Sequence, residues 1–461
     1  MATDAAPAPA VPSDPARAEA LTWKFPHWFW WANFIELFER AAFYGLFIAI
    51  ALFLTDVVGF TDIQAGYISA IFSAGIYLLP FISGALADRF GFRAALIFAF
   101  AALCVGYTLV GLFPNKVFVP FALALVCIGG SFVKPIITGT VSLASNATTR
   151  ARAFSIFYML VNIGSFSGKT FAKPVRIDVG LGFIPIYAGV IAGIGLCLVI
   201  LFYRPEAPPG AMSKSIKENI DGLKTVLQNR RFVALILITA GFWIIQGQMY
   251  ASMPKYVLRT VGEGSSPEWY ANVNPAVVVL CVVTITQIVK KWRPVNSIVV
   301  AMALIPFSAV IMAVSNVFAG GAGSTILGLH PVAFTMIIGI ALQGFSECFL
   351  SPRYLEYASK QAPVGQEGLY MGFSNLNTFV AWLTGFIASG YLLDAFCPDP
   401  KKLSVEVQTA HALALKGQGP MPEAYANANY LWLTFAAVGF VAFLALLMFR
   451  ATEKKEAVPA A

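Results

Sequence analysis

Charged residues are scarce in this sequence. Only 12% of its 461 residues are Asp, Glu, Lys or Arg, and 58% are hydrophobic, whereas a soluble domain carries about 25% charged residues. Histidine is rarer still, with three residues at His27, His330 and His411. The sequence contains no HExxH pair and no Ser/His/Asp grouping. These shortages argue against a soluble protein and against an enzyme.

Clustered cysteines and clustered basic residues are also lacking. Five of the six cysteines fall within apolar segments without metal-site spacing, so we expect buried free thiols and no metal site. The net charge of +8 is not gathered into a basic cluster interleaved with aromatic residues, which argues against a nucleic-acid partner. The N-terminus has no basic region followed by a short apolar core, so we do not predict a cleaved signal peptide.

Long apolar segments are what the chain has instead. Each is long enough to cross a hydrocarbon core of ~30 Å as a helix, and helices satisfy the backbone groups that lipid cannot. The predicted fold class is therefore an all-α polytopic membrane protein with twelve transmembrane helices. The predicted spans are 28–54, 62–86, 93–113, 116–142, 153–174, 179–203, 231–256, 270–289, 295–318, 331–350, 368–393 and 428–449.

A polar stretch at 204–230 divides these spans into two sets of six. It contains charges, a Pro-rich turn and the pattern SIKENIDGLKTVLQN, which is typical of an amphipathic helix on a membrane surface. We therefore predict two six-helix bundles, 28–203 and 231–450, joined by a cytoplasmic linker. The ends, 1–27 and 451–461, are predicted to be cytoplasmic tails, and the first of them to be disordered.

The loop charges indicate the orientation. With the N-terminus inside, the inner loops and tails hold 19 Lys and Arg residues and the outer loops hold 9. This bias predicts a multi-pass protein of the plasma membrane, the bacterial inner membrane, with both termini in the cytoplasm. Two sets of six helices are typical of secondary transporters, which bind solute near the midplane between the halves. No ring-forming repeat or re-entrant filter segment suggests a channel.

Five ionisable residues lie well inside the apolar spans, namely Glu36, Glu39, Arg40, Lys134 and Glu347. A charge near the bilayer centre costs roughly 2.5–3.5 kcal/mol on insertion scales, so these side chains are expected to face a polar cavity. The first three stand at i, i+3 and i+4 and share one helical face. The last two come from the fourth helix of each half. We expect them to face each other, which suits a solute with both a carboxylate and an ammonium.

Three acids against two bases leave one negative charge unmatched in a low-dielectric space. Such a carboxylate can take up a proton near neutrality, as a proton-coupled transporter requires. It could equally await a cationic group of the substrate. An ion pair that only fixes helix packing is the weaker alternative, because one acid would be enough for Arg40. Two further basic residues, Lys169 and Arg353, lie nearer the ends of their spans, where such side chains could snorkel toward the headgroups.

The stretch GALADRFGFR (84–93) ends the second span. Its small-residue face followed by Asp88, Arg89 and Arg93 suits a gate that slides between two states, and Gly84 begins it. An ordinary positively charged inner loop is the alternative.

These motifs together resemble the major facilitator superfamily and, within it, the proton-coupled oligopeptide transporter (POT) family. GALADRFGFR resembles the superfamily's loop between helices 2 and 3. Glu36-x-x-Glu39-Arg40 followed by Phe43-Tyr44-Gly45 resembles the POT first-helix signature, and FSIFYMLVNIGSFSG (154–168) resembles the fifth-helix signature. GGSFVKP (129–135), NPAVV (274–278) and ECFLSP (347–352) also fit, so the resemblance spans helices 1 to 11.

The resemblance implies twelve helices in two bundles and import of di- and tripeptides by alternating access, driven by protons and without a cofactor. Glu36 and Glu39 would then be the proton-linked acids, exchanging between Arg40 and Lys134. Those two basic residues would attract the peptide carboxylate, and Glu347 would hold the peptide amine. The remaining implied pocket residues are Tyr44, Tyr77, Asn162, Asn274, Trp243 and Phe373.

Several positions depart from the POT pattern. Phe47 stands where the family often has Arg, and Gly247 stands where it has an acid. These two usually pair as an outer gate, and losing both avoids a lone charge. Phe43 replaces the first signature Tyr. These changes favour, as the alternative, a related carrier for an organic anion or a modified amino acid. In either case we expect a monomer in the bilayer whose partner is a small-molecule substrate.

Overall fold

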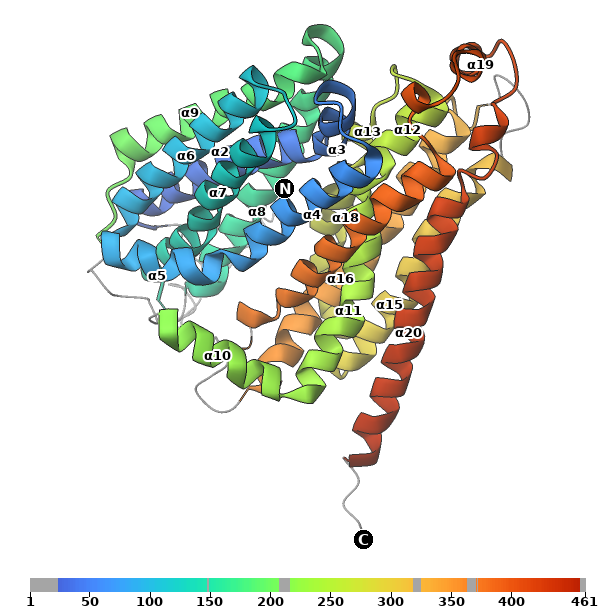
Figure 1. Cartoon of the computed structure of the whole chain (residues 1–461). Helices are drawn as coiled ribbons and strands as arrows, with labels where there is room; N and C mark the ends of the chain where they lie inside the picture. The colour runs from blue at the N-terminus through green and yellow to red at the C-terminus, as the bar shows by residue number, and fades with distance from the viewer. Residues whose placement is uncertain are drawn as a thin grey trace, which may run out of the picture.

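The computed structural model describes residues 24–146, 149–206, 216–317, 325–362, 370 and 372–456. Most of the predicted N-terminal tail, part of the linker and the last five residues lie outside this part of the chain. Within it the chain is helical, and the single β-pairing is an isolated bridge between Ile326 and Leu329. Every predicted span contains a long helix or a bent pair of helices (Figure 1), which confirms the all-α polytopic fold class.

The N-terminal half contains two bent spans and four single helices. Each bent span consists of two helices whose axes differ by 43°. The elements are α2 (His27–Phe47), α3 (Ile50–Leu52), η1 (Phe53–Val57), α4 (Asp62–Leu78), α5 (Pro80–Phe90), α6 (Phe92–Leu112), α7 (Phe118–Leu143), α8 (Arg150–Pro174), η2 (Val175–Val179), η3 (Leu181–Phe183) and α9 (Ile184–Phe202).

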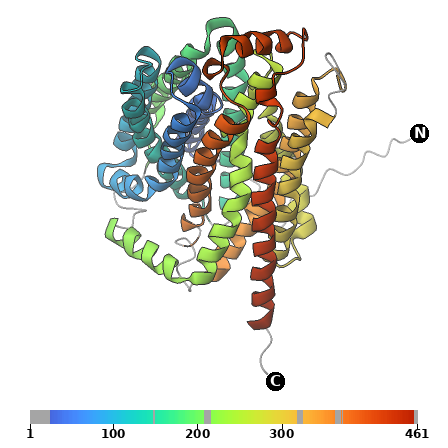
Figure 2. The same ribbon diagram turned by 45° about the vertical axis from the view of Figure 1, so that its right-hand side comes forward.

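The C-terminal half contains six long helices and several short ones. The short helices α12, α13 and α19 gather at the same end of the molecule as α3, and α10 crosses below both halves at the opposite end (Figures 1 and 2). The elements are α10 (Ile216–Gln228), α11 (Arg230–Ala251), α12 (Met253–Val261), α13 (Pro267–Tyr270), α14 (Val273–Val289), α15 (Pro294–Ala313), η4 (Val314–Val317), α16 (Pro331–Gln361), α18 (Leu376–Phe396), η5 (Pro400–Lys402), α19 (Val405–Leu415), η6 (Glu423–Tyr425) and α20 (Tyr430–Glu456).

The number of membrane spans depends on how α8 is counted. In the described part of the chain, nine helices are long and apolar enough to cross a membrane, and eleven spans result if each bent pair is one span. The predicted fifth span, α8, is missing from that set. Its 25 residues include four basic ones, at 150, 152, 169 and 173. Helix α8 packs along α2 within the bundle. The count reaches twelve only if α8 is also a span, and its basic residues are then stabilised by contacts with protein rather than with lipid.

Two glycines allow α8 to lie directly against α2. A Cβ atom at Gly164 would come within 2.4 Å of the Leu37 carbonyl oxygen, and one at Gly168 within 2.2 Å of the Ala41 carbonyl oxygen. Their spacing is the small-xxx-small pattern with which membrane helices approach closely. The residues they touch lie on the same turns of α2 as the predicted ionic residues, so this contact fixes where those side chains stand.

Replacing Gly168 with Ala is expected to lower stability by about 1–3 kcal/mol, because the added methyl group forces two backbones apart. Thermal unfolding of the purified protein in detergent measures this. Gly193→Ala in α9 is the matched control, because a Cβ atom there meets only Cys104 Sγ, at 3.7 Å. Equal melting temperatures for the two variants would contradict the close-packing argument.

The two halves are held together at the end opposite α10. Buried Asp62 at the start of α4 accepts hydrogen bonds from Lys255 Nζ, at 2.8 Å, and from both terminal nitrogens of Arg259, at 3.0 Å. A second buried pair joins Arg176 of η2 to Glu268 of α13. In the sequence these basic residues stand in predicted outer loops and count only as loop charges, whereas in the structure they join the two halves.

At the other end, α10 packs against both halves. Val226 on α10 is buried in a small apolar cluster with Phe232 of α11 and with Phe373, and Phe81 of α5 borders the same cluster. The predicted linker helix is present. One of its faces lies on protein at the junction of the two halves.

Candidate functional site

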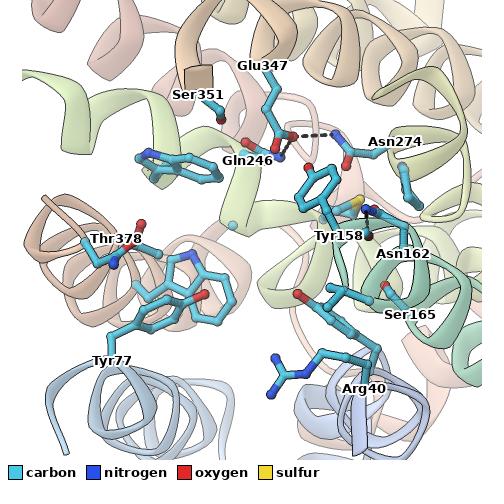
Figure 3. A pocket seen from close by; sticks show the side chains of 18 of the residues that line it. Arg40, Tyr77, Tyr158, Asn162, Ser165, Gln246, Asn274, Glu347, Ser351 and Thr378 are labelled. Carbon is cyan, nitrogen blue, oxygen red and sulfur yellow. Dashed lines mark hydrogen bonds between the residues drawn. The ribbon is translucent and has the colours of Figure 1, made fainter. Parts of the chain in front are cut away.

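A cavity of about 350 Å³ lies between the two halves, within the usual size range of small-molecule sites. Side chains of α2, α4, α7 and α8 line it from one half, and side chains of α11, α14, α16 and α18 from the other. Figure 3 shows Arg40 and Glu347 entering it from opposite sides. The structure thus forms the cavity where a transporter with two equivalent halves is expected to bind its solute.

Nine of the predicted site residues line this cavity, so the structure brings them together from seven different helices. They are Glu36, Arg40, Tyr44, Tyr77, Lys134, Asn162, Trp243, Asn274 and Glu347. Their individual roles stay predictions.

Glu36, Glu39 and Arg40 form one ionic group, as their spacing predicts. Arg40 Nε lies 3.2 Å from Glu36 Oε1 and donates a short hydrogen bond to Glu39 Oε2. Both acids are 1% exposed, and Glu39 lies behind Arg40, away from the cavity lining. The second oxygen of Glu36, Oε2, has no hydrogen-bond partner in the described structure. Two carboxylates therefore share one guanidinium, and one carboxylate oxygen remains available.

Lys134, on α7, also lines the cavity, and its side chain is exposed there. Within the described residues, no carboxylate oxygen lies within 4 Å of its ammonium. In this state both acids are with Arg40, so the exchange of partners with Lys134 stays a prediction about another state.

Glu347 is held by amides. Its Oε2 accepts a hydrogen bond from Gln246 Nε2, at 2.6 Å, and one from Asn274 Nδ2, at 3.4 Å (Figure 3). Gly344, one turn earlier on α16, packs against the Asn274 carbonyl and brings the two helices together. No cation lies within 4 Å of this carboxylate in the described part of the chain. Sequence reasoning missed Gln246, although a glutamine inside an apolar span was an available signal.

The sequence prediction for Lys169 was wrong. The side chain is 0% exposed, and its Nζ donates to the carbonyl of Ala271, across the boundary between the halves, at 3.3 Å. It lies 5.6 Å from the ring centre of Tyr44 and 5.8 Å from that of Tyr250. Snorkelling needs a lipid-facing position, whereas this turn of α8 faces the other half. The cavity lining and Glu39 together therefore contain three acids and three bases, and the single excess negative charge disappears.

Arg353 does not snorkel either. It is buried, and its guanidinium pairs with Glu356 one turn along α16 and with the Trp292 carbonyl oxygen. The end of α16 packs on protein at this point, which keeps the side chain away from the lipid headgroups.

Aromatic rings occupy the place of the absent gate charges. The Phe47 ring stacks on Trp382, with ring centres 5.1 Å apart, and on Phe43, at 5.0 Å. A Cβ atom at Gly247 would lie 3.6 Å from Trp382 Cδ1 and Nε1, so the missing side chain leaves room for the indole. Phe47, Phe43 and Trp382, which we call the aromatic plug, pack where the family pattern would place a salt bridge.

Phe373 is not a pocket residue, contrary to the sequence prediction. It is 2% exposed and stacks on Phe81 with ring centres 4.6 Å apart. It precedes the first residue of α18, Leu376, so it packs toward α5 and α10. The eleventh helix contributes Trp382 to the cavity instead, a residue that sequence reasoning did not single out.

The predicted gating stretch covers the end of α5 and the turn into α6. Gly91 there has φ of 85°, which permits the sharp turn. Arg89 is exposed, and Arg93 donates to the Ile200 carbonyl at the end of α9, at 2.8 Å. A Cβ atom at Gly84 would lie 3.6 Å from Pro135 Cβ, which is ordinary van der Waals contact. The Asp88 side chain lies outside what the structure describes. Sliding of this stretch stays a prediction.

Comparison with known proteins supports the same architecture. The family model of the Major Facilitator Superfamily matches residues 32–322. A curated relative, multidrug resistance protein MdtH of Salmonella typhi, is 21% identical over 405 residues, covering 88% of this chain and 89% of MdtH. Among solved structures, the POT family transporter PepTSo aligns with a TM-score of 0.72 at 17% identity, covering 94% of this chain and 99% of PepTSo.

A second solved structure, a POT family transporter in complex with 5-aminolevulinic acid, aligns with a TM-score of 0.71 at 17% identity, covering 91% of this chain and 95% of that one. At this level of identity the likeness shows a shared fold. The resemblance to the superfamily predicted from the sequence motifs is confirmed.

Proposed function

Because the chain belongs to the major facilitator superfamily, we propose that it is a proton-coupled symporter that imports small peptides or peptide-like zwitterions. Members of this superfamily are membrane transporters rather than enzymes, and the chain is a multi-pass membrane protein. The observation that carries the proposal is the separation of charge in the cavity. Glu347, which has no cationic partner among the described residues, lies opposite Arg40, and Lys134 lines the same space.

This arrangement complements a molecule with an amine at one end and a carboxylate at the other. Gln246 and Asn274 orient the Glu347 carboxylate without neutralising it, so its charge remains available to an ammonium. Arg40 and Lys134 offer donors to a carboxylate, which bonds to such cations more strongly than to neutral donors. The cavity volume of about 350 Å³ sets an upper limit near the size of a short peptide.

The proposed proton site is the group of Glu36, Glu39 and Arg40. Two buried carboxylates share one guanidinium, and Glu36 Oε2 is left without a partner. Protonation of either acid leaves one carboxylate paired with Arg40 and frees guanidinium donors for a second anion, whereas loss of that proton restores a carboxylate that occupies those donors. The substrate carboxylate is the anion that would compete for them. This competition links proton release to substrate movement.

A second candidate is a carrier for organic anions, modified amino acids or aromatic drugs. It is favoured by the cavity's aromatic lining, which includes Tyr77, Trp243, Tyr250 and Trp382. Trp243 and Trp382 each have an indole N–H without an acceptor in the described structure. Flat aromatic solutes would find stacking surfaces there.

The test combines a binding screen with transport. We expect di- and tripeptides to raise the melting temperature of the purified protein more than single amino acids or organic acids do. We also expect peptide uptake into proteoliposomes to rise when the outside is made acidic, and to fall when an ionophore removes the gradient. Uptake that does not change with the pH gradient would refute proton coupling. A larger rise in melting temperature with organic anions than with peptides would favour the second candidate.

We further propose a plasma-membrane location with both termini in the cytoplasm and a monomeric state. Helix α10 and the C-terminal end of α20 lie at the same end of the molecule (Figure 1), as that topology requires. Under this orientation the ion pairs of Asp62 and Arg176 close the outer side. Labelling of single cysteines introduced at positions 218 and 264 from outside intact cells would test the assignment of sides.

A further inference from the structure

Among the residues that the structure describes, Lys169 is a buried basic side chain with no carboxylate beside it. Its side chain is 0% exposed, yet its ammonium makes one hydrogen bond, to the Ala271 carbonyl at 3.3 Å. An ammonium carries three donors, so two of them have no protein acceptor in the described part of the chain. Removing a charge from water is costly unless a partner of opposite charge offsets it. The position therefore favours an anion that the described residues do not provide.

The free side of this ammonium is the cavity. Lys169 belongs to the cavity lining, together with Tyr44 and Tyr250, whose ring centres lie 5.6 Å and 5.8 Å from Nζ. Neither tyrosine can neutralise the cation. Both rings also line the cavity, so an acidic group bound beside them would lie close to Nζ.

The set of charges balances once Glu39 is included, but the contacts among the lining residues support the same conclusion. The cavity is lined by the acids Glu36 and Glu347 and by the bases Arg40, Lys134 and Lys169. Glu36 is already paired with Arg40, and Glu347 is the acid available for an amine. Two ammonium groups, at positions 134 and 169, remain without a carboxylate. A simple peptide zwitterion brings one carboxylate and therefore leaves one of them unmatched.

We infer that Lys169 forms a subsite for a second acidic group, so that the preferred substrate is a small peptide with an acidic side chain. This inference rests on the proposed function and specifies its substrate class. The peptide amine binds at Glu347, one carboxylate binds at Arg40 and Lys134, and the second carboxylate binds at Lys169. The contact to Ala271 places the subsite at the boundary of the two halves, beside the closed end of the cavity.

Competition against labelled dialanine uptake in proteoliposomes tests this with two peptides of equal size. Ala-Glu and Ala-Gln differ only in the charge of one side chain. We expect the wild-type protein to bind Ala-Glu about tenfold more tightly, because a charged acceptor replaces a neutral one at a buried ammonium. Lys169→Met keeps the length and removes the charge, and it is expected to bring the two affinities within about twofold. Lys169→Arg should restore the preference.

Lys173→Met is the matched control one helical turn along α8. Its ammonium bonds to Ser266 Oγ and lies outside the cavity lining, so the Ala-Glu to Ala-Gln ratio should stay at the wild-type value. Equal wild-type affinities for the two peptides would overturn the inference. The inference would also be overturned if Lys169→Met lowered the affinities for Ala-Glu and Ala-Gln by the same factor. That result would mean that Lys169 serves only as a structural contact to Ala271.

The outcomes separate this inference from the proposed function. Binding of peptides without a charge preference removes the Lys169 subsite and leaves the peptide symporter in place. Failure to bind any peptide refutes the peptide symporter. In that case the melting temperature of the protein with free glutamate, compared with free glutamine, tests the subsite alone. A larger rise with glutamate supports the subsite, and equal rises refute it. If Lys169→Met does not fold, the wild-type comparison of these matched pairs still decides the question.

Discussion

Replacing Glu36 with Gln is expected to abolish proton-driven uptake while leaving exchange of substrate across the membrane at equal pH. The amide still accepts a hydrogen bond from Arg40, which lies 3.2 Å from Glu36 in the native protein, but it can neither bind nor release a proton. The cavity should therefore keep its shape and lose its link to the gradient. Glu39→Gln should behave in the same way, because the two acids share one guanidinium.

Two assays on the same proteoliposomes distinguish these activities. Uptake is measured under an imposed acidic exterior, and counterflow is measured with unlabelled substrate trapped inside at equal pH. Glu406→Gln is the control, because that side chain is exposed on the short helix α19, outside the cavity lining. A Glu36→Gln protein that still accumulates substrate in response to the gradient would show that the proton travels by another route.

Replacing Glu347 with Gln should weaken binding of unmodified peptides at least about thirtyfold, which corresponds to losing about 2 kcal/mol for one partner of a buried charge pair. The substitution keeps an acceptor for Gln246 and Asn274, so the fold should survive. The loss arises because the substrate ammonium would be desolvated without a carboxylate to meet it.

Acetylation of the peptide amine provides the matching change on the ligand. We expect acetylation to weaken binding strongly in the wild-type protein and to have little effect in Glu347→Gln, since the same interaction has already been removed. Binding constants from thermal-shift titrations or uptake competition are sufficient. If acetylation lowers the peptide affinity of the wild-type protein and of Glu347→Gln by the same factor, the amine binds somewhere other than Glu347.

Local regularities in the sequence were enough to predict the helices and much of the site. Apolar length alone predicts the spans, and the spacing of Glu36, Glu39 and Arg40 predicts their shared face. The cost of burying charge predicts that Lys134 and Glu347 face a cavity, and both line it. Each of these inferences depends on residues a few positions apart or on the free-energy cost of placing a charge in lipid. Each can therefore be made before the tertiary structure is known.

What the sequence could not supply is which part of a helix faces lipid and which faces the other half. Lys169 lies near the end of an apolar span, where snorkelling is a reasonable expectation, but the structure turns it toward Ala271. Asp62 and Lys255 are far apart in sequence and give no local sign of their contact. Phe373 and Trp382 differ by about two and a half turns, and only the start of α18 decides which ring reaches the cavity.

The aromatic plug of Phe43, Phe47 and Trp382 has a consequence for energy conservation. A carrier driven by protons must stop them from hopping along a file of water molecules while its outer end is shut. Stacked rings close a passage by dewetting and offer almost no hydrogen-bonding groups to such a file. A salt bridge at the same place would attract water to its charges. In a proton-driven carrier of the kind proposed, the ring stack would act as an insulator, and such a closure would need neither a particular pH nor a particular salt concentration to hold.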